Sequence, residues 1–204
     1  MKLAMFGATG RVGGEILKRA LEDGHQVTAL QRSPKLDKHP NLGTVFGNVR
    51  NRNDVERSIA GADAVISALG TDKATTLTDA MPFIIESMER NGIKRIITIG
   101  TAGILNSRLE EGKLRYQGGD SNRKMTFAAE QHEKAFRMLE KSGLEWTVVC
   151  PTYLPDGEAK GGYRVEKDYL PEGGREISVG DTADFAYRQL EDTTYIKSRA
   201  GLAY

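Results

Sequence analysis

Short apolar segments alternate with longer segments of helical periodicity through the first 150 residues, and this alternation constrains the fold more than any other feature. Segments 3–6, 26–30, 44–46, 63–69, 94–99 and 146–150 have the length and composition of strands. Segments 15–22, 77–90 and a stretch ending at 141 repeat apolar residues at the spacing of one helix face. Strands that alternate with helices form parallel sheets, so the sequence predicts a doubly wound α/β fold.

Polar residues before the periodic segments predict where the other helices begin. The expected N-caps are Asn53 or Asp54 for a helix ending at 59, Ser121 or Asn122 for the helix ending at 141, and Asp181 for a last helix ending at 190. Beyond Pro151 the alternation stops, because three Pro and six Gly lie between 151 and 180. We therefore expect one domain, with a dinucleotide-binding core over 1–150 and a small irregular C-terminal substrate lobe over 151–204.

The charge balance and the cysteine content exclude several classes of partner. The chain carries 29 Lys and Arg against 28 Asp and Glu, a net charge of +1, so no bulk field attracts nucleic acid or an anionic membrane. The single cysteine, Cys150, cannot form an internal disulfide or a multi-cysteine metal site. With neither a signal-peptide pattern nor a membrane-spanning apolar run, we expect a cytoplasmic protein without metal, either a monomer or a weak homo-oligomer.

A glycine-rich turn, GATGRVG, lies between the first predicted strand and the first predicted helix. Gly7 permits a tight turn, Gly10 lets a pyrophosphate approach the backbone, and Gly13 permits close packing of helix on strand. The free N–H groups and the positive end of the helix dipole then favour phosphate. Glycine content elsewhere is also high, and a simple turn is the alternative. The position between strand and helix favours a Rossmann-type nucleotide site.

The end of the second predicted strand indicates which dinucleotide binds. An NAD site places Asp or Glu about 20 residues after the glycines, where it accepts a hydrogen bond from the ribose 2′-hydroxyl. This chain has Gln31, Arg32 and Ser33 there. Arg32 can bind a 2′-phosphate with two parallel hydrogen bonds, and Ser33 can donate another. The sequence therefore favours NADP over NAD, with a solvated surface arginine as the alternative.

Ligands of doubly wound sheets bind at the carboxyl ends of the strands. That rule selects segments 7–13, 31–33, 47–49, 68–71, 100–103 and 151–156. The loops 103–121 and 155–176 should wall a substrate pocket, because long loops at this edge are usually functional.

Sequence segments along nearly the whole chain, in order, resemble a known family. They are GATGRVGG, TALQRSP, GNVRN, DAVISALGT, RIITIGTAG, KSGLEWTVVCPTYL and GGYRV with REISVGDTADF. The chain resembles the atypical short-chain dehydrogenase/reductases of the NAD(P)H-binding, NmrA-like group, and within it the biliverdin reductase B-like, NADPH-dependent flavin reductases. The resemblance implies a Rossmann-type parallel sheet, NADP binding and reduction of flavins or similar planar acceptors.

The resemblance also implies roles for individual residues. It places Thr9, Gly10, Arg11 and Val12 in the phosphate loop with Gly7 and Gly13, Arg32 on the 2′-phosphate, Asn48 and Val49 beside adenine, Leu69, Gly70 and Thr71 (after Ala68) beside the riboses, and Thr101, Pro151, Thr152 and Tyr153 around the nicotinamide. Asn48 replaces the family's Asp and keeps a hydrogen-bond acceptor.

One departure from the wider family bears directly on the chemistry. Carbonyl-reducing short-chain dehydrogenases use a Tyr as acid/base and a Lys four residues later. Counting back from Ser142-Gly143, Ala128 stands at the Tyr position and His132 at the Lys position. Helical spacing places His132 on the apolar face with Phe136. It is a core histidine, a ribose contact or a proton relay.

Without the tyrosine acid, a flavin or quinone is the favoured acceptor, since the nicotinamide cofactor performs the difficult chemistry. Tyr153 is a proton donor, a stacking platform or a core aromatic, and Thr101 either contacts the reacting groups or caps its strand. Trp146 and Cys150 are expected to be structural. The alternative function is a non-catalytic NADP(H)-binding sensor of the NmrA-like type. A sugar-nucleotide epimerase or hydroxysteroid dehydrogenase is less favoured, because both would need the Tyr.

Overall fold

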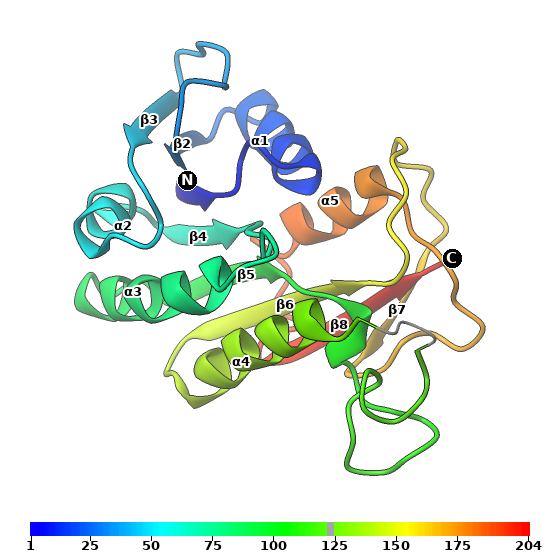
Figure 1. Cartoon of the computed structure of the whole chain (residues 1–204). Coiled ribbons are helices and arrows are strands. Elements are labelled where there is room, and N and C mark those ends of the chain that lie inside the picture. The colour runs from blue at the N-terminus through cyan, green and yellow to red at the C-terminus, as the bar shows by residue number, and fades with distance from the viewer. Residues whose placement is uncertain (122–124) are drawn as a thin grey trace.

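A computed structural model describes residues 1–121 and 125–204 of the protein. Within them, eight strands form one sheet in the order β3-β2-β1-β4-β5-β6-β8-β7 (Figure 1). Neighbouring strands are parallel except for β7, which is antiparallel to β8 at one edge. The predicted doubly wound Rossmann-type α/β fold is confirmed.

The bounds of the elements are as follows. The strands are β1 (Lys2–Phe6), β2 (Gln26–Gln31), β3 (Leu42–Phe46), β4 (Ala64–Ser67), β5 (Arg95–Ile99), β6 (Glu145–Pro151), β7 (Arg164–Lys167) and β8 (Ser198–Ala203). The helices are α1 (Arg11–Glu22), α2 (Arg52–Ile59), α3 (Thr76–Arg90), α4 (Phe127–Lys141) and α5 (Val179–Arg188), with a 3₁₀ turn η1 (Ala102–Ile104).

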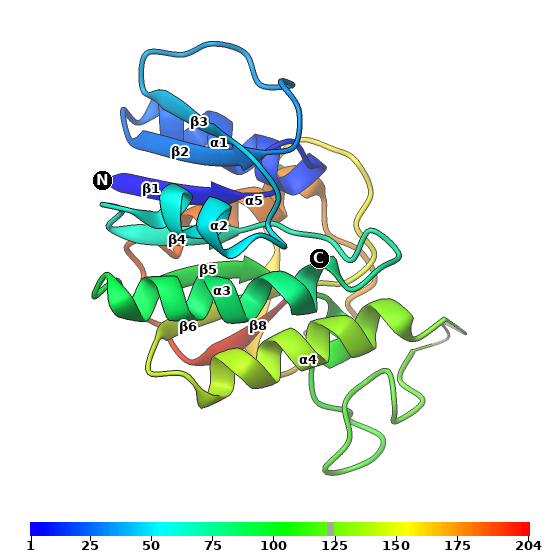
Figure 2. The same ribbon diagram turned by 60° about the vertical axis from the view of Figure 1, so that its left-hand side comes forward.

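Helices cover both faces of the sheet: α1 and α5 lie on one face and α2, α3 and α4 on the other (Figure 2). The alternation of side chains along β1 shows why. Leu3 and Met5 pack with the α1 and α5 side, whereas Ala4 and Phe6 pack with the α2–α4 side. From Leu3 to Phe6 this central strand is apolar at every position and buried on both faces, as parallel sheets require. In the described residues, no helix is long and apolar enough to cross a membrane.

Several predicted helix starts are wrong because other residues provide the cap. Helix α1 begins at Arg11 rather than at 15. Asn51, not Asn53 or Asp54, caps α2 by accepting a hydrogen bond from the backbone N–H of Asp54 at 3.2 Å. In α2 the predicted caps Asn53 and Asp54 are the second and third helical residues, where polar side chains resemble a cap in sequence.

The later helices show the same displacement. Helix α4 begins after Thr126 rather than after Ser121, and Asn122 lies outside the described residues. Ser178 caps α5, with its Oγ accepting from the N–H of Asp181 at 3.1 Å. The Asp181 carboxylate instead accepts from the N–H groups of Lys160 and Gly161. This helix ends at Arg188 rather than at 190.

The segment after Pro151 contains two strands, β7 and β8, where no strand was expected. Strand β8 joins the sheet beside β6, and its Arg199 is buried. The Arg199 guanidinium donates to the carboxylate of Asp168 at 2.9 Å and to Asn106 Oδ1 at 2.8 Å. Strand β8 lacks the apolar pattern of the other strands because it contains a charged residue and a glycine. The charge can be buried because tertiary partners satisfy its hydrogen bonds.

Candidate functional site

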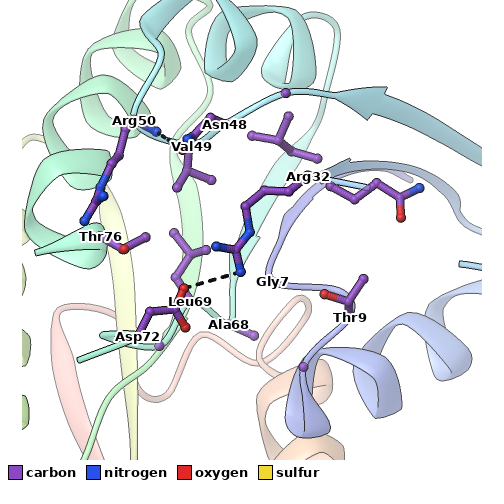
Figure 3. A pocket seen from close by; sticks show the side chains of 15 residues that line it. Gly7, Thr9, Arg32, Asn48, Val49, Arg50, Ala68, Leu69, Asp72 and Thr76 are labelled. Carbon is purple, nitrogen blue, oxygen red and sulfur yellow. Dashed lines mark hydrogen bonds and ion pairs between the residues drawn. The ribbon is translucent and has the colours of Figure 1, made fainter. Parts of the chain in front are cut away.

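A cleft opens at the carboxyl ends of β1, β2 and β4 (Figure 3). Its walls come from the connections that follow β1, β2, β3 and β4, as expected at this edge of a doubly wound sheet. The lining residues are Gly7, Thr9, Gly10, Leu30, Gln31, Arg32, Gly47, Asn48, Val49, Arg50, Ala68, Leu69, Gly70, Asp72 and Thr76.

The glycine turn at the base of the cleft leaves no room for side chains. Gly7 has φ +80°, and a Cβ there would lie 2.4 Å from the carbonyl oxygen of Ala68. A Cβ on Gly13 would lie 2.1 Å from the carbonyl oxygen of Gly7. The backbone N–H of Gly10 donates to the carbonyl of Gly7 at 3.0 Å. The turn therefore packs the start of α1 directly onto the ends of β1 and β4.

The start of α1 fits a dinucleotide pyrophosphate. Its N-cap is Gly10, and no side chain caps the helix within the described residues. The first N–H groups of a helix have no partner inside the helix, and the dipole is positive at this end. Thr9 lines the cleft beside them. Uncapped N–H groups, a positive dipole end and a glycine surface are the features that phosphate groups need.

The opposite side of the cleft carries the residues expected at adenosine. Arg32 follows β2 and points across the cleft, with 76% of its side chain exposed. Asn48 and Val49 follow β3 and line the same wall. The Oδ1 of Asn48 accepts a hydrogen bond from the N–H of Arg50 at 3.0 Å, which fixes the turn. Ser33 and Thr71 are outside the set of described residues that line the cleft.

A second pocket opens at the carboxyl ends of β5 and β6. Thr101, Pro151, Thr152 and Tyr153 all line it, so the structure brings together the residues expected around the nicotinamide. The Oγ1 of Thr101 accepts from the N–H of Gly103 at 3.4 Å, which caps η1. The remaining lining residues are Ala102, Gly103, Arg115, Tyr116, Asp120, Ser121, Met125, Thr126, Ala128, Ala129 and Arg175.

Two tyrosines line the second pocket, and they differ in their freedom to donate a proton. The hydroxyl of Tyr116 donates to the carboxylate of Glu133 at 2.5 Å. Burial and this carboxylate raise the pKa of Tyr116. Tyr153 is 59% exposed. Tyr116 is therefore a poor acid, and Tyr153 is the more exposed of the two tyrosines.

Ala128 and His132 occupy different surroundings although they lie one helical turn apart on α4. Ala128 lines the second pocket, so the position of the missing acid is part of its wall. His132 lines neither the cleft nor this pocket. Burial lowers the pKa of His132 to about 4, so its ring is neutral at pH 7. Burial likewise raises the pKa of the Cys150 thiol to about 12, so the thiol is unreactive.

Two residues of the predicted phosphate loop, Arg11 and Val12, direct their side chains away from the cleft and into contacts with the rest of the fold. The side chain of Val12 is buried in the core on the α1 side of the sheet. Arg11 points away to the loop after β6, where its guanidinium donates to the carbonyl of Leu154 at 3.0 Å and to the Asp156 carboxylate at 2.7 Å.

Sequence reasoning missed residues that line the two sites. Arg50, Asp72 and Thr76 line the cleft, and Arg115 and Arg175 line the second pocket. Asp72 and Arg50 directly follow the selected strand-end segments, so extending each segment by one residue would have found them. Arg115 and Arg175 lie in the loops 103–121 and 155–176 that were expected to wall a substrate pocket, but no sequence pattern marks these two residues within the loops.

These features together define a Rossmann-type dinucleotide-binding protein, with a phosphate-binding turn and a cleft across the carboxyl edge of the sheet. A comparison with known families makes the assignment more specific. The sequence model of the NAD(P)H-binding family matches residues 7–193, and the chain belongs to this family.

Individual relatives agree with this assignment. The chain is 26% identical over 199 residues to the uncharacterized protein YwnB of Bacillus subtilis (strain 168), covering 94% of this chain and 92% of YwnB. It is similar to SP1627 of Streptococcus pneumoniae TIGR4, a candidate NADH-flavin reductase, with 25% identity, TM-score 0.82 and coverage of 100% and 99%. A candidate epimerase of Bacteroides thetaiotaomicron has 26% identity, TM-score 0.84 and coverage of 100% and 96%. Such neighbours are typical of an NmrA-like atypical short-chain dehydrogenase/reductase.

Proposed function

We propose that the protein is an NADPH-dependent reductase that passes a hydride to a planar conjugated acceptor, a flavin or a quinone. The observation that carries the proposal is the juxtaposition of two sites on one sheet edge. The cofactor cleft lies at β1, β2 and β4, and the second pocket follows at the adjacent ends of β5 and β6. A cofactor lying along this edge reaches from the first site to the second.

The chain's own residues bind and orient the two reactants. NADPH, when bound, supplies the hydride. The uncapped N–H groups of α1 hold its pyrophosphate, and Arg32 favours a 2′-phosphate. In the second pocket, Thr101 and Thr152 offer hydroxyl groups, and the exposed ring of Tyr153 offers a face on which a planar acceptor stacks. Orientation of this kind contributes much of the rate when the cofactor carries the chemistry.

The composition of the second pocket favours an acceptor that needs little acid catalysis. Ala128 stands where carbonyl-reducing relatives carry their acid, and the Tyr116 hydroxyl is held by Glu133. A missing general acid costs a ketone reduction about 10²–10⁴ in rate. A flavin or quinone ring delocalises the charge it receives and takes its proton from water. The similarity to a candidate NADH-flavin reductase supports this acceptor class.

A second candidate function, a non-catalytic NADP(H) sensor, is favoured by the same Ala128, because the position of the catalytic acid holds no proton donor.

The decisive assay follows oxidation of NADPH and of NADH at 340 nm with FMN, riboflavin and a quinone in turn. Oxidation that rises with acceptor concentration and saturates supports the reductase. Submicromolar to micromolar cofactor binding without acceptor-dependent oxidation would exclude it and leave the sensor.

The assignment of Arg32 is tested separately, by direct binding. Arg32→Ala should weaken NADPH binding about tenfold or more, because it removes charge-assisted hydrogen bonds to the 2′-phosphate. NADH binding should change less than twofold. Arg188→Ala is the matched control, since Arg188 is similarly exposed but lies on α5. Equal losses for both cofactors would remove the 2′-phosphate role of Arg32.

A further inference from the structure

Both arginines that line the cofactor cleft face a carboxylate from the segment after β4. The Arg32 guanidinium lies 3.5 Å from Oδ2 of Asp72, and the Arg50 guanidinium lies 3.1 Å from Oδ2 of Asp79 (Figure 3 shows the first pair). The positive charge in the cleft is therefore largely balanced. A ligand phosphate meets paired arginines rather than free ones.

The two pairs differ in how readily they open. Asp79 is also held by Thr75, whose Oγ1 donates to it at 2.8 Å. The Arg32–Asp72 distance is longer than the 2.7–2.9 Å typical of charge-assisted hydrogen bonds. Both of its side chains are more than half exposed, and exposed pairs are weak. Arg32 is therefore the arginine that can be drawn away from its carboxylate.

Asp72 itself lines the cleft on the wall opposite β2, so it stays close to any group that Arg32 binds. The 2′-phosphate of NADPH must take Arg32 from Asp72 and leave that carboxylate unpaired beside an anion. The 2′-hydroxyl of NADH does not require Arg32 to leave Asp72 and places no anion beside the carboxylate. A hydroxyl can also donate a hydrogen bond to a carboxylate. The two cofactors therefore differ in their effect on this one pair.

We propose that Asp72 is a specificity-determining residue that limits the preference for NADPH over NADH by competing with the 2′-phosphate for Arg32. The inference rests on the proposed function, in which Arg32 selects the 2′-phosphate. Asp72 sets how large the selection is. The site then uses both cofactors, with NADPH ahead by less than a free arginine would give.

The test is a double-mutant cycle read by cofactor binding alone, without an acceptor. NADPH and NADH are titrated into the wild type, Asp72→Asn, Arg32→Ala and the double variant, and the reduced nicotinamide fluorescence gives each Kd. Asp72→Asn keeps the shape of the side chain and removes its charge. It should raise the ratio of NADPH to NADH affinity about fivefold, the upper range for an exposed ion pair. In the Arg32→Ala background the rise should fall below about twofold.

A matched control separates this pair from a general effect of charge. Asp63→Asn makes the same change at the opposite edge of the sheet, where Asp63 accepts from the N–H of Lys2, and should leave the ratio unchanged. A ratio unchanged in Asp72→Asn overturns the proposal. So does an equal rise in the Arg32→Ala background or in Asp63→Asn. Absence of acceptor-dependent oxidation would overturn only the reductase, because these ratios need no turnover, whereas failure to bind either cofactor would overturn both.

Discussion

The cofactor cleft and the second pocket lie side by side on one sheet edge, but they are built from different materials. The phosphate end of the cleft is formed by backbone: the glycines of the turn, the ends of buried strands and the first N–H groups of α1. The second pocket is formed by side chains on long connections. Among these, Met125 is 88% exposed and Tyr153 is 59% exposed.

The difference in construction determines how easily each site can be altered by substitution. A site made of backbone is as rigid as the strands that hold it, so its geometry cannot change without moving the sheet. A site made of exposed loop side chains can be altered residue by residue with little cost to the fold. Dinucleotide binding is thus set by the fold, whereas the proposed selection of NADPH by Arg32 and the choice of acceptor depend on replaceable side chains.

The largest expected effect comes from adding one methyl group to the backbone-built site. Gly13→Ala should weaken NADPH binding at least about 100-fold and destabilise the protein by about 1–3 kcal/mol, because its Cβ would lie 2.1 Å from the carbonyl oxygen of Gly7. Cofactor titration and urea unfolding measure the two effects.

The next residue along the helix provides the control. In Gly14→Ala the nearest atom to the new Cβ is the Ala8 carbonyl oxygen at 3.6 Å, an ordinary contact. Binding should stay near the wild-type value, and the helix should gain about 0.5–1 kcal/mol. If Gly13→Ala binds NADPH as well as Gly14→Ala does, the glycine turn is not the rigid element described above.

A second prediction concerns the helix behind the second pocket, where the partly exposed His132 has its pKa lowered to about 4 by desolvation and is a neutral ring at pH 7. In the unfolded chain this histidine binds a proton with a pKa near 6.5, whereas in the folded protein it binds one only as the pH falls to about 4. Stability is therefore present above pH 6.5 and is lost as the pH falls toward 4. Between pH 7 and pH 5 this histidine should cost about 2 kcal/mol of unfolding free energy.

Urea unfolding at both pH values, for the wild type and His132→Gln, measures that cost as a difference of differences. Contributions from the other ionisable groups are common to both proteins and cancel. Equal pH dependence of the unfolding free energy in the two proteins would show that the His132 ring is hydrated in the folded state. The surroundings of His132 would then resemble the exposed side chains of the second pocket rather than the rigid turn of the cleft.

The same contrast explains how much could be predicted from sequence. The segment KRIITI was placed within one residue of β5, and the glycine turn was placed correctly, because apolar runs and glycine spacing record burial and backbone geometry directly. Strand β8 was missed, since the burial of Arg199 depends on Asp168 and Asn106 from distant segments. The Arg32–Asp72 pair was missed for the same reason: two loops meet only in the folded sheet.

A third prediction tests the side-chain-built site. Tyr153→Ala should raise the KM for FMN about tenfold, because loss of an aromatic stacking partner costs about 0.5–1.5 kcal/mol beyond the area it buried. Tyr153→Phe keeps the ring and should keep the KM. A fall of kcat in Tyr153→Phe would instead assign the hydroxyl as the proton donor. A KM unchanged in Tyr153→Ala would mean that the acceptor does not stack on this ring.

The smallest effect is expected where the two regions are joined. Arg11, on the helix of the cofactor cleft, pairs with Asp156 on the loop after β6 at 2.7 Å, with side chains 57% and 79% exposed. Asp156→Asn should change the unfolding free energy by less than about 0.5 kcal/mol, because solvent and salt screen an exposed ion pair. In this variant the Arg11 guanidinium still donates to the carbonyl of Leu154. Urea unfolding at low and at 0.5 M salt measures it. A loss above about 1.5 kcal/mol would show that the two sites are coupled through this pair rather than through the sheet they share.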